Sequence, residues 1–175
     1  MKLSKSIEKL EYSQALESDK EANKWLDKNG RRFGQFIGGE FLSNKKADQI
    51  KVSNPSDSSI LASIEIADDK TVDLAVSAAA KSQKSWYKSG GHARAKVLYA
   101  LARLIQKHSR VISVLETLNN GKPIRESRDA DIPLAIRHFY YHAGWAQLQE
   151  SELQGQEPVG VVAQIIPWNF PFLML

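Results

Sequence analysis

Cysteine is absent from all 175 positions of this sequence. A chain without thiols forms no disulfide, supplies no thiolate to a metal and contains no cysteine nucleophile. The lack of disulfides fits a reducing compartment. Residues 1–9 alternate charged with single apolar residues and lack the continuous apolar stretch of a secretory signal. We therefore expect a cytoplasmic protein.

Long apolar runs and concentrated patches of one charge are also missing. The most apolar stretch, residues 159–175, is interrupted by Gln164, Asn169 and two prolines, whereas a membrane span needs about 20 apolar residues. The net charge is +4, but the 24 basic residues are interleaved with 20 acidic ones and form no basic footprint. The sequence therefore predicts neither a membrane span nor a nucleic-acid partner.

The composition is that of a soluble globular protein, with 42% hydrophobic and 25% charged residues. Residues 1–32 are polar with sparse apolar positions, which predicts an extension whose short helices must dock to be ordered. Residues 33–41 place a Gly-Gly pair between aromatic and β-branched residues, as in a tight hairpin. Strict alternation from Ile60 to Ile66, after a turn at residues 54–58, predicts a half-buried strand.

Helical periodicity dominates the middle of the chain. Asp68 or Asp69 is expected to cap a helix whose apolar stripe runs from Val72 to Trp86. Two more helices follow over residues 98–105 and 111–118, and the second ends at Gly121. Asp131 as cap, with Pro133 in the first turn, predicts another helix through residue 148, followed by a connection over residues 149–157.

Residues 159–166 form a β-branched run suited to a strand buried on both faces of a parallel sheet. A parallel pair needs a connection of about a dozen residues or more, yet the sequence ends at Leu175, after barely one turn of a helix starting near Pro171. We expect an α/β fold that is truncated, with helices and one strand of a larger sheet.

Several motifs, in order, resemble the aldehyde dehydrogenase superfamily. The most specific is the run from Glu157 to Pro171, which contains Pro167-Trp168-Asn169. The hairpin at residues 36–41 and the segments at 54–55, 118–123 and 140–146 match as well. The resemblance covers residues 33–175 and implies the amino-terminal part of such an enzyme, with the first strand of its dinucleotide-binding sheet. Residues 31–36 and 137–148 are most similar to the sixteenth family, whose members carry two dehydrogenase-like units in tandem.

The resemblance implies a role for Asn169 in catalysis. Covalent aldehyde oxidation uses a thiolate that attacks the carbonyl, and the oxyanion formed needs preorganised donors. The side-chain amide of Asn169 matches one of these donors. The hydride then passes to NAD or NADP, a cofactor that such folds bind at the carboxyl ends of parallel strands. The matching positions are Ile165, Ile166, Pro167 and Trp168 for the cofactor cleft, and Phe170 and Met174 for the aldehyde tunnel.

Residue type alone supports simpler interpretations of these positions. Asn169 read alone is a helix-capping or turn residue, and Trp168, Phe170 and Met174 are packing residues. His138 and His142 stand four residues apart on the expected helix, a spacing that allows a shared metal. Because a zinc site needs three or four ligands and no third is evident, we predict no metal site.

The family's nucleophilic cysteine, general-base glutamate and cofactor-binding lysine all follow the Pro-Trp-Asn motif, so the resemblance places them beyond this sequence. We therefore expect the full-length parent to oxidise an aldehyde to an acid, and this chain to be inactive alone. The parent is expected to be a homo-oligomer, with a dimer favoured because residues 149–157 replace a longer insert that adds strands for oligomer contacts. The alternative is a non-catalytic subunit or interaction module that covers its exposed strand edge with a partner.

Overall fold

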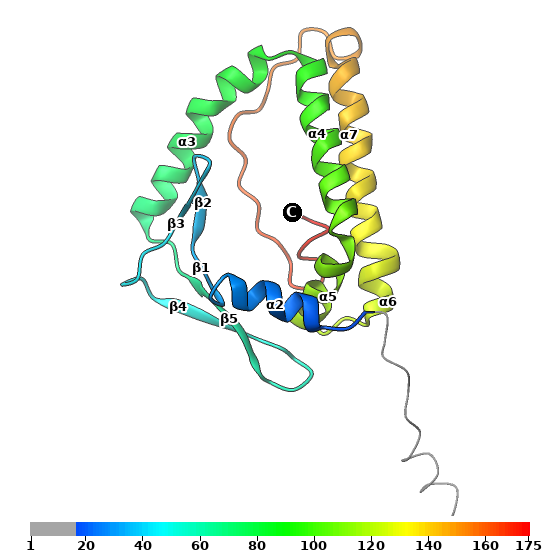
Figure 1. Ribbon diagram of the computed structural model, residues 1–175. Coiled ribbons are helices and arrows are strands. Elements are labelled where there is room, and N and C mark those ends of the chain that lie inside the picture. Colours follow the sequence, from blue (N-terminus) through cyan, green and yellow to red (C-terminus); the bar gives the residue numbers. More distant parts are fainter. Residues whose placement is uncertain (1–16) are drawn as a thin grey trace, which may run out of the picture.

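The computed structural model describes residues 17–175, so residues 1–16 of the expected extension lie outside the described residues. In Figure 1 the long helices α4 and α7 lie side by side, α3 stands apart from them, and the strands gather toward one end. The elements, in chain order, are α2 (Lys20–Lys28), β1 (Arg32–Phe33), β2 (Gln35–Ile37), β3 (Glu40–Leu42), β4 (Gln49–Ser53), β5 (Ile60–Glu65), α3 (Asp69–Lys88), α4 (Gly91–Lys107), α5 (Ser109–Asn120), α6 (Ile124–Glu126), the π-helix Ser127–Asp131 and α7 (Ile132–Glu152).

The Gly-Gly hairpin is confirmed as the antiparallel pair β2 and β3. Gly38 and Gly39 have φ of 64° and 91°, values that only glycine adopts without strain at both positions of a two-residue turn. Arg32 and Phe33 begin a separate sheet in which β5 is central, parallel to β1 and antiparallel to β4. The expected strand near residues 60–66 is therefore present.

The expected buried face of β5 is wrong in detail. Ile60, Ile64 and Ile66 remain 44–53% exposed, while the consecutive residues Leu61 and Ala62 are both buried. The register between β4 and β5 shifts at Val52/Ser53. An irregularity of this kind places an unpaired residue in one strand and interrupts simple alternation.

Glu65, at the end of β5, is a buried carboxylate that accepts three hydrogen bonds. Its side chain has no exposed surface. Ser43 Oγ and the Arg32 Nε group each donate to Oε1 at 2.7 Å, and the Asn44 amide donates to Oε2 at 2.6 Å. These bonds, led by Ser43 and followed by Asn44 and Arg32, lower the pKa of Glu65 from 4.5 to about 2.

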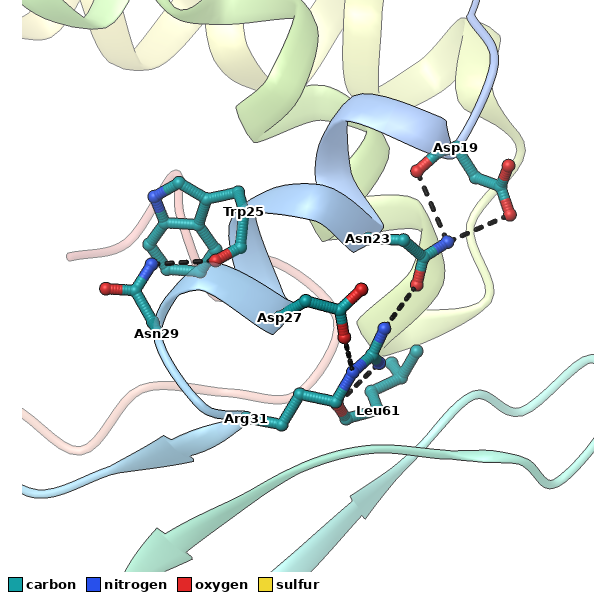
Figure 2. Close-up of polar contacts among 7 residues, drawn as sticks. All are labelled: Asp19, Asn23, Trp25, Asp27, Asn29, Arg31 and Leu61. Atoms are coloured by element: carbon teal, nitrogen blue, oxygen red, sulfur yellow. Dashed lines mark hydrogen bonds and ion pairs between the residues drawn. The ribbon is translucent and has the colours of Figure 1, made fainter.

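Helix α2 shows how the last part of the expected extension docks. Ala22 and Leu26 are buried, and α2 packs on α5. Figure 2 shows the Arg31 guanidinium reaching Asp27 at 2.6 Å, Asn23 at 3.1 Å and the Leu61 carbonyl at 3.0 Å. Because Leu61 belongs to β5, this one side chain ties α2 to the three-stranded sheet.

Helix α3 begins as expected, but its apolar stripe is not packed. The Asp68 side chain accepts the Thr71 amide at 2.9 Å and caps the helix. No α3 residue is buried, and Val72, Val76 and Trp86 of the stripe are 43–51% exposed. An amphipathic helix buries its stripe only against another surface, and within residues 17–175 the principal contact of α3 is with the short strand β2.

Helices α4 and α7 approach each other through small residues. Ala95, Ala102 and Ala143 are completely buried. A Cβ added at Gly91 would lie 2.0 Å from the Ala146 carbonyl oxygen on α7, so the backbones there are too close for any side chain. The pair also buries Arg94, which donates to Gln149 at 2.7 Å and to the Tyr87 carbonyl at 2.7 Å.

Helix α5 ends as expected at Gly121, which adopts the left-handed conformation with φ of 77° and donates its amide to the Thr117 carbonyl. The expected cap of the next helix is wrong. Asp131 lies in the π-helix with αR backbone angles, makes no capping bond and pairs with Lys122. Since the helical path continues from Ile124 through the π-helix, α7 has no free amino-terminal turn at Asp131 to cap.

The segment after α7 departs further from expectation. Helix α7 extends to Glu152, so the expected connection starts later than residue 149. Within the described chain, residues 159–166 form no strand. The physical reason is that a strand needs a neighbour for its backbone hydrogen bonds. The chain then makes a turn in which the Met174 amide donates to the Phe170 carbonyl.

The α4–α7 contact yields a paired test. We expect Gly91→Ala to destabilise the fold by about 1–3 kcal/mol because backbone must move to admit the methyl group. Gly144→Ala is the matched control on α7, where a Cβ would meet no atom within 4 Å. It should stabilise the protein by about 0.5–1 kcal/mol through higher helix propensity. Urea unfolding measures both, and equal effects would contradict the close packing at Gly91.

The buried Glu65 predicts a defined dependence of stability on pH. Its folded pKa is depressed, so its contribution is complete above pH 4.5 and is lost as the pH falls toward about 2. We expect Glu65→Gln to unfold more easily than wild type at neutral pH, and the difference to shrink through that window. Urea unfolding along a pH series tests this, with Glu40→Gln, on an exposed carboxylate of β3, as the control. A difference that stays constant with pH would refute the assignment.

Candidate functional site

The residues expected to form the site lie on residues 153–175, called the site segment below, which runs in Figure 1 from the top of α7 down between α3 and α4 to α5. Ile165 is 99% exposed and Trp168 83% exposed. Ile166 is half-buried, while Pro167 and Asn169 are exposed. These positions are adjacent along the chain, but within the described residues they form no enclosed cofactor cleft.

Phe170 and Met174, expected on the aldehyde tunnel, are 37% and 51% exposed. Phe170 has a specific partner: the Lys122 ammonium lies 3.9 Å from the centre of its ring. A cation at this distance over an aromatic face is attracted by the ring quadrupole, most strongly where water is partly excluded. Lys122 is largely buried, with a side chain 17% exposed.

A second contact reaches the same segment from α5. Glu116 is buried, and its Oε1 atom accepts the Phe172 amide at 3.5 Å and the Asn120 side-chain amide at 3.4 Å. Burial raises the pKa of Glu116, the Phe172 amide bond opposes that rise, and the charge of Asp131 adds to it. Burial therefore disfavours the charged form of Glu116, while a backbone amide of the site segment donates a hydrogen bond to it.

Lys122 is itself held in place from two sides. Its ammonium forms an ion pair with Asp131 at 2.5 Å, and its amide donates to the Asn120 side chain at 2.8 Å. The loop before it is packed, since a Cβ at Gly121 would lie 2.8 Å from the Pro55 ring. The ammonium thus sits between a buried carboxylate and the Phe170 ring, in a geometry that leaves it little freedom.

Sequence reasoning missed this cluster. The sequence predicts a helix cap at Asp131, includes Lys122 only within the motif at residues 118–123, and gives no role to Glu116. One signal was available: Glu116 is the only acidic residue of α5, and it sits among the apolar positions of that helix. A lone carboxylate on a buried helix face needs partners, which is a reason to search for them.

An open apolar groove of about 440 Å³ lies beside this cluster. Of the site segment, only Phe172 reaches it; none of the six expected cofactor and substrate residues does. The other lining residues come from α2, the three-stranded sheet and α5: Trp25, Leu26, Phe33, Val52, Leu61, Ala62, Ile64, Ile112, Leu115, Glu116 and Asn119.

His138 and His142 both lie exposed on α7. Across residues 17–175, no group of three or more histidines, cysteines, aspartates or glutamates is arranged to hold a metal ion. Nor does any helix of the described part have the length and apolar character needed to cross a membrane.

Comparison with known proteins decides the family. A sequence model described as the aldehyde dehydrogenase family matches residues 41–175. This chain belongs to the aldehyde dehydrogenase family. The match includes Asn169 and the Lys122 loop, so both the motif and the contacts around it fall within the family region. The expectation drawn from the Pro-Trp-Asn run is confirmed at the level of the superfamily.

Individual relatives agree. DhaS of Bacillus subtilis, which carries an aldehyde dehydrogenase name, is 39% identical over 155 residues, covering 79% of this chain and 30% of that protein. A mutant aldehyde dehydrogenase from Bacillus cereus has a TM-score of 0.78 at 34% identity, covering 88% of this chain and 33% of that one. The NAD⁺ complex of aldehyde dehydrogenase from Bacillus cereus has a TM-score of 0.72 at 37% identity, with 79% and 31% covered.

The described helices and small sheets therefore correspond to part of the aldehyde dehydrogenase fold. The chain spans about a third of the length of these relatives.

Proposed function

We propose that this chain is part of an enzyme that oxidises an aldehyde to a carboxylic acid with NAD or NADP as acceptor. The observation that carries the proposal is the family match over residues 41–175, which includes the Pro167-Trp168-Asn169 motif. A relative crystallised with NAD⁺ supports a nicotinamide cofactor. Pro167, Trp168 and Asn169 are exposed among the described residues, so further chain or a partner can complete a site there.

Asn169 is the residue to which we assign direct catalytic work. Its amide N–H groups can donate to the oxygen of a carbonyl that is becoming tetrahedral, and an amide does so without titrating. A thiolate must attack that carbonyl, and this chain has no cysteine, so the nucleophile has to come from elsewhere. Bound cofactor supplies the hydride acceptor.

Ile165, Ile166, Pro167 and Trp168 are proposed to line one wall of the cofactor cleft, and Phe170 and Met174 the aldehyde tunnel. The exposure of Ile165 and Trp168 supports this assignment, because apolar residues of a binding segment stay uncovered until the opposite wall is in place. We further propose that the chain divides into an extension over residues 1–32 and a dehydrogenase part over residues 33–175. We also propose that it belongs to the sixteenth family, that it is located in the cytoplasm and that its full-length parent is a dimer.

The second candidate is a non-catalytic subunit. Val159 is 94% and Ile165 99% exposed, and their segment has no strand partner among residues 17–175. Such a segment can add to the sheet edge of another chain. Sequencing the gene beyond the Leu175 codon separates the two candidates. A continuing frame that encodes a cysteine-containing dehydrogenase segment supports the enzyme; a stop codon there favours the subunit.

Alone, the 175-residue chain should show no aldehyde-dependent reduction of NAD or NADP, because no thiol is present to attack the carbonyl. A spectrophotometric assay with several aldehydes, alongside an active aldehyde dehydrogenase as positive control, measures this. Turnover by the purified chain above the buffer rate would overturn the proposed thiolate mechanism.

In a protein that contains this segment together with the catalytic cysteine, Asn169→Ala should lower kcat by about 100- to 1,000-fold through loss of one oxyanion donor. The matched control is Gln164→Ala, which removes another exposed amide of the same segment and should leave kcat nearly unchanged. If both variants retain wild-type turnover, Asn169 is not an oxyanion donor.

A further inference from the structure

Two independent contacts hold the chain immediately after Asn169. The Phe170 ring lies against the Lys122 ammonium, and the Phe172 amide donates to Glu116. Both partners come from the α5 helix or the loop that ends it, and both are themselves buried or largely buried. Before Asn169, by contrast, Trp168 and Ile165 are exposed.

The residue between the two contacts is Pro171, whose ring fixes its φ. The turn is closed by the bond from the Met174 amide to the Phe170 carbonyl at 3.1 Å. Residues 170–174 therefore form a short unit with one charged contact, one backbone contact and one internal bond. Asn169 precedes this unit directly, so the direction of its backbone depends on how the unit is seated.

We propose that Glu116 and Lys122 are positioning residues that seat residues 170–172 on α5 and thereby orient the Asn169 amide. Asp131 completes the arrangement by fixing the Lys122 ammonium in its ion pair. The importance of this orientation for catalysis rests on the proposed function. The contacts themselves lie within this chain and can be tested in it.

The charges explain why two different side chains are used. A buried carboxylate can accept a backbone amide, which specifies the position of the main chain. An ammonium attracts an aromatic face, which specifies the ring. Together they fix main chain and side chain of the same unit, which neither contact does alone.

The Lys122–Phe170 contact has its own spectroscopic signature. In the isotope-labelled 175-residue chain, the ring current of Phe170 should move the Lys122 ε-methylene proton resonances upfield. Phe170→Leu keeps an apolar side chain and the Lys122–Asp131 ion pair, but should return these resonances to the values of an ordinary lysine. Unshifted ε-methylene resonances in the wild-type chain would overturn the contact.

The positioning effect is measured by the backbone order parameter of Asn169. We expect about 0.85, typical of rigid backbone, in the wild-type chain, and a fall to below about 0.6 in Glu116→Leu and Lys122→Met. Glu116→Gln keeps an acceptor oxygen and Lys122→Arg keeps a cation, so both should restore the wild-type value. A low order parameter in the wild type, or no change in Glu116→Leu and Lys122→Met, overturns the proposal.

General loosening of α5 is excluded by a control on the same helix. Thr117→Val removes the bond from Thr117 to Ser127 at 3.0 Å without touching the site segment, and should leave the order parameter of Asn169 unchanged. An equal fall in this variant would refute a specific role for Glu116 and Lys122. Should Lys122→Met not fold, Phe170→Leu carries the test of that contact, and an unchanged Asn169 order parameter in it counts against the proposal.

These measurements need no turnover, so their failure is distinct from failure of the proposed function. Suppose that Asn169 is rigid only when Glu116 and Lys122 are present, but that Asn169→Ala is fully active in the longer protein. The positioning would then be supported, and the catalytic role of Asn169 would be refuted.

Discussion

The close approach of α4 and α7 is the constraint on which the rest of this structure depends. Gly91 meets the Ala146 carbonyl with no room for a side chain, and such contact sets the relative height of the two helices within a fraction of a turn. The relative height of the two helices fixes the position in space of the amino-terminal end of α7. It thereby fixes the position of Asp131, which precedes α7 and pairs with Lys122. The packing of α4 on α7 thus influences the position of the site segment through the ion pair between Asp131 and Lys122.

Two apolar surfaces are not covered by the described residues. Helix α3 buries none of its residues, and residues 159–166 have no strand partner within the described chain. Both carry apolar side chains, which are costly to leave in water. Residues 170–172 are held by contacts with Lys122 and Glu116, whereas Ile165 and Trp168 before them are exposed.

The features that sequence patterns predict correctly are those that depend only on neighbouring residues. The Gly38-Gly39 turn, the Asp68 cap and the Gly121 stop each follow from the backbone preferences of a few adjacent residues. What failed depends on distant partners. The predicted buried face of β5 is wrong because its pairing with β4 shifts in register. The predicted cap at Asp131 is wrong because this carboxylate pairs with Lys122, nine positions earlier. The proposed catalytic role of Asn169 rests on family resemblance, because residue type and exposure alone do not distinguish it from any other asparagine in a turn.

The bond from the Phe172 amide to Glu116 carries a requirement on chain length. Pro171 has no amide hydrogen, so Phe172 is the first residue after it that can donate to the buried carboxylate. Inserting one residue between Asn169 and Pro171 would bring the proline nitrogen, which has no hydrogen, to the place of the Phe172 amide. Glu116 would then lose its donor from the site segment and keep that of Asn120. A proline three positions after Asn169 is therefore incompatible with this contact.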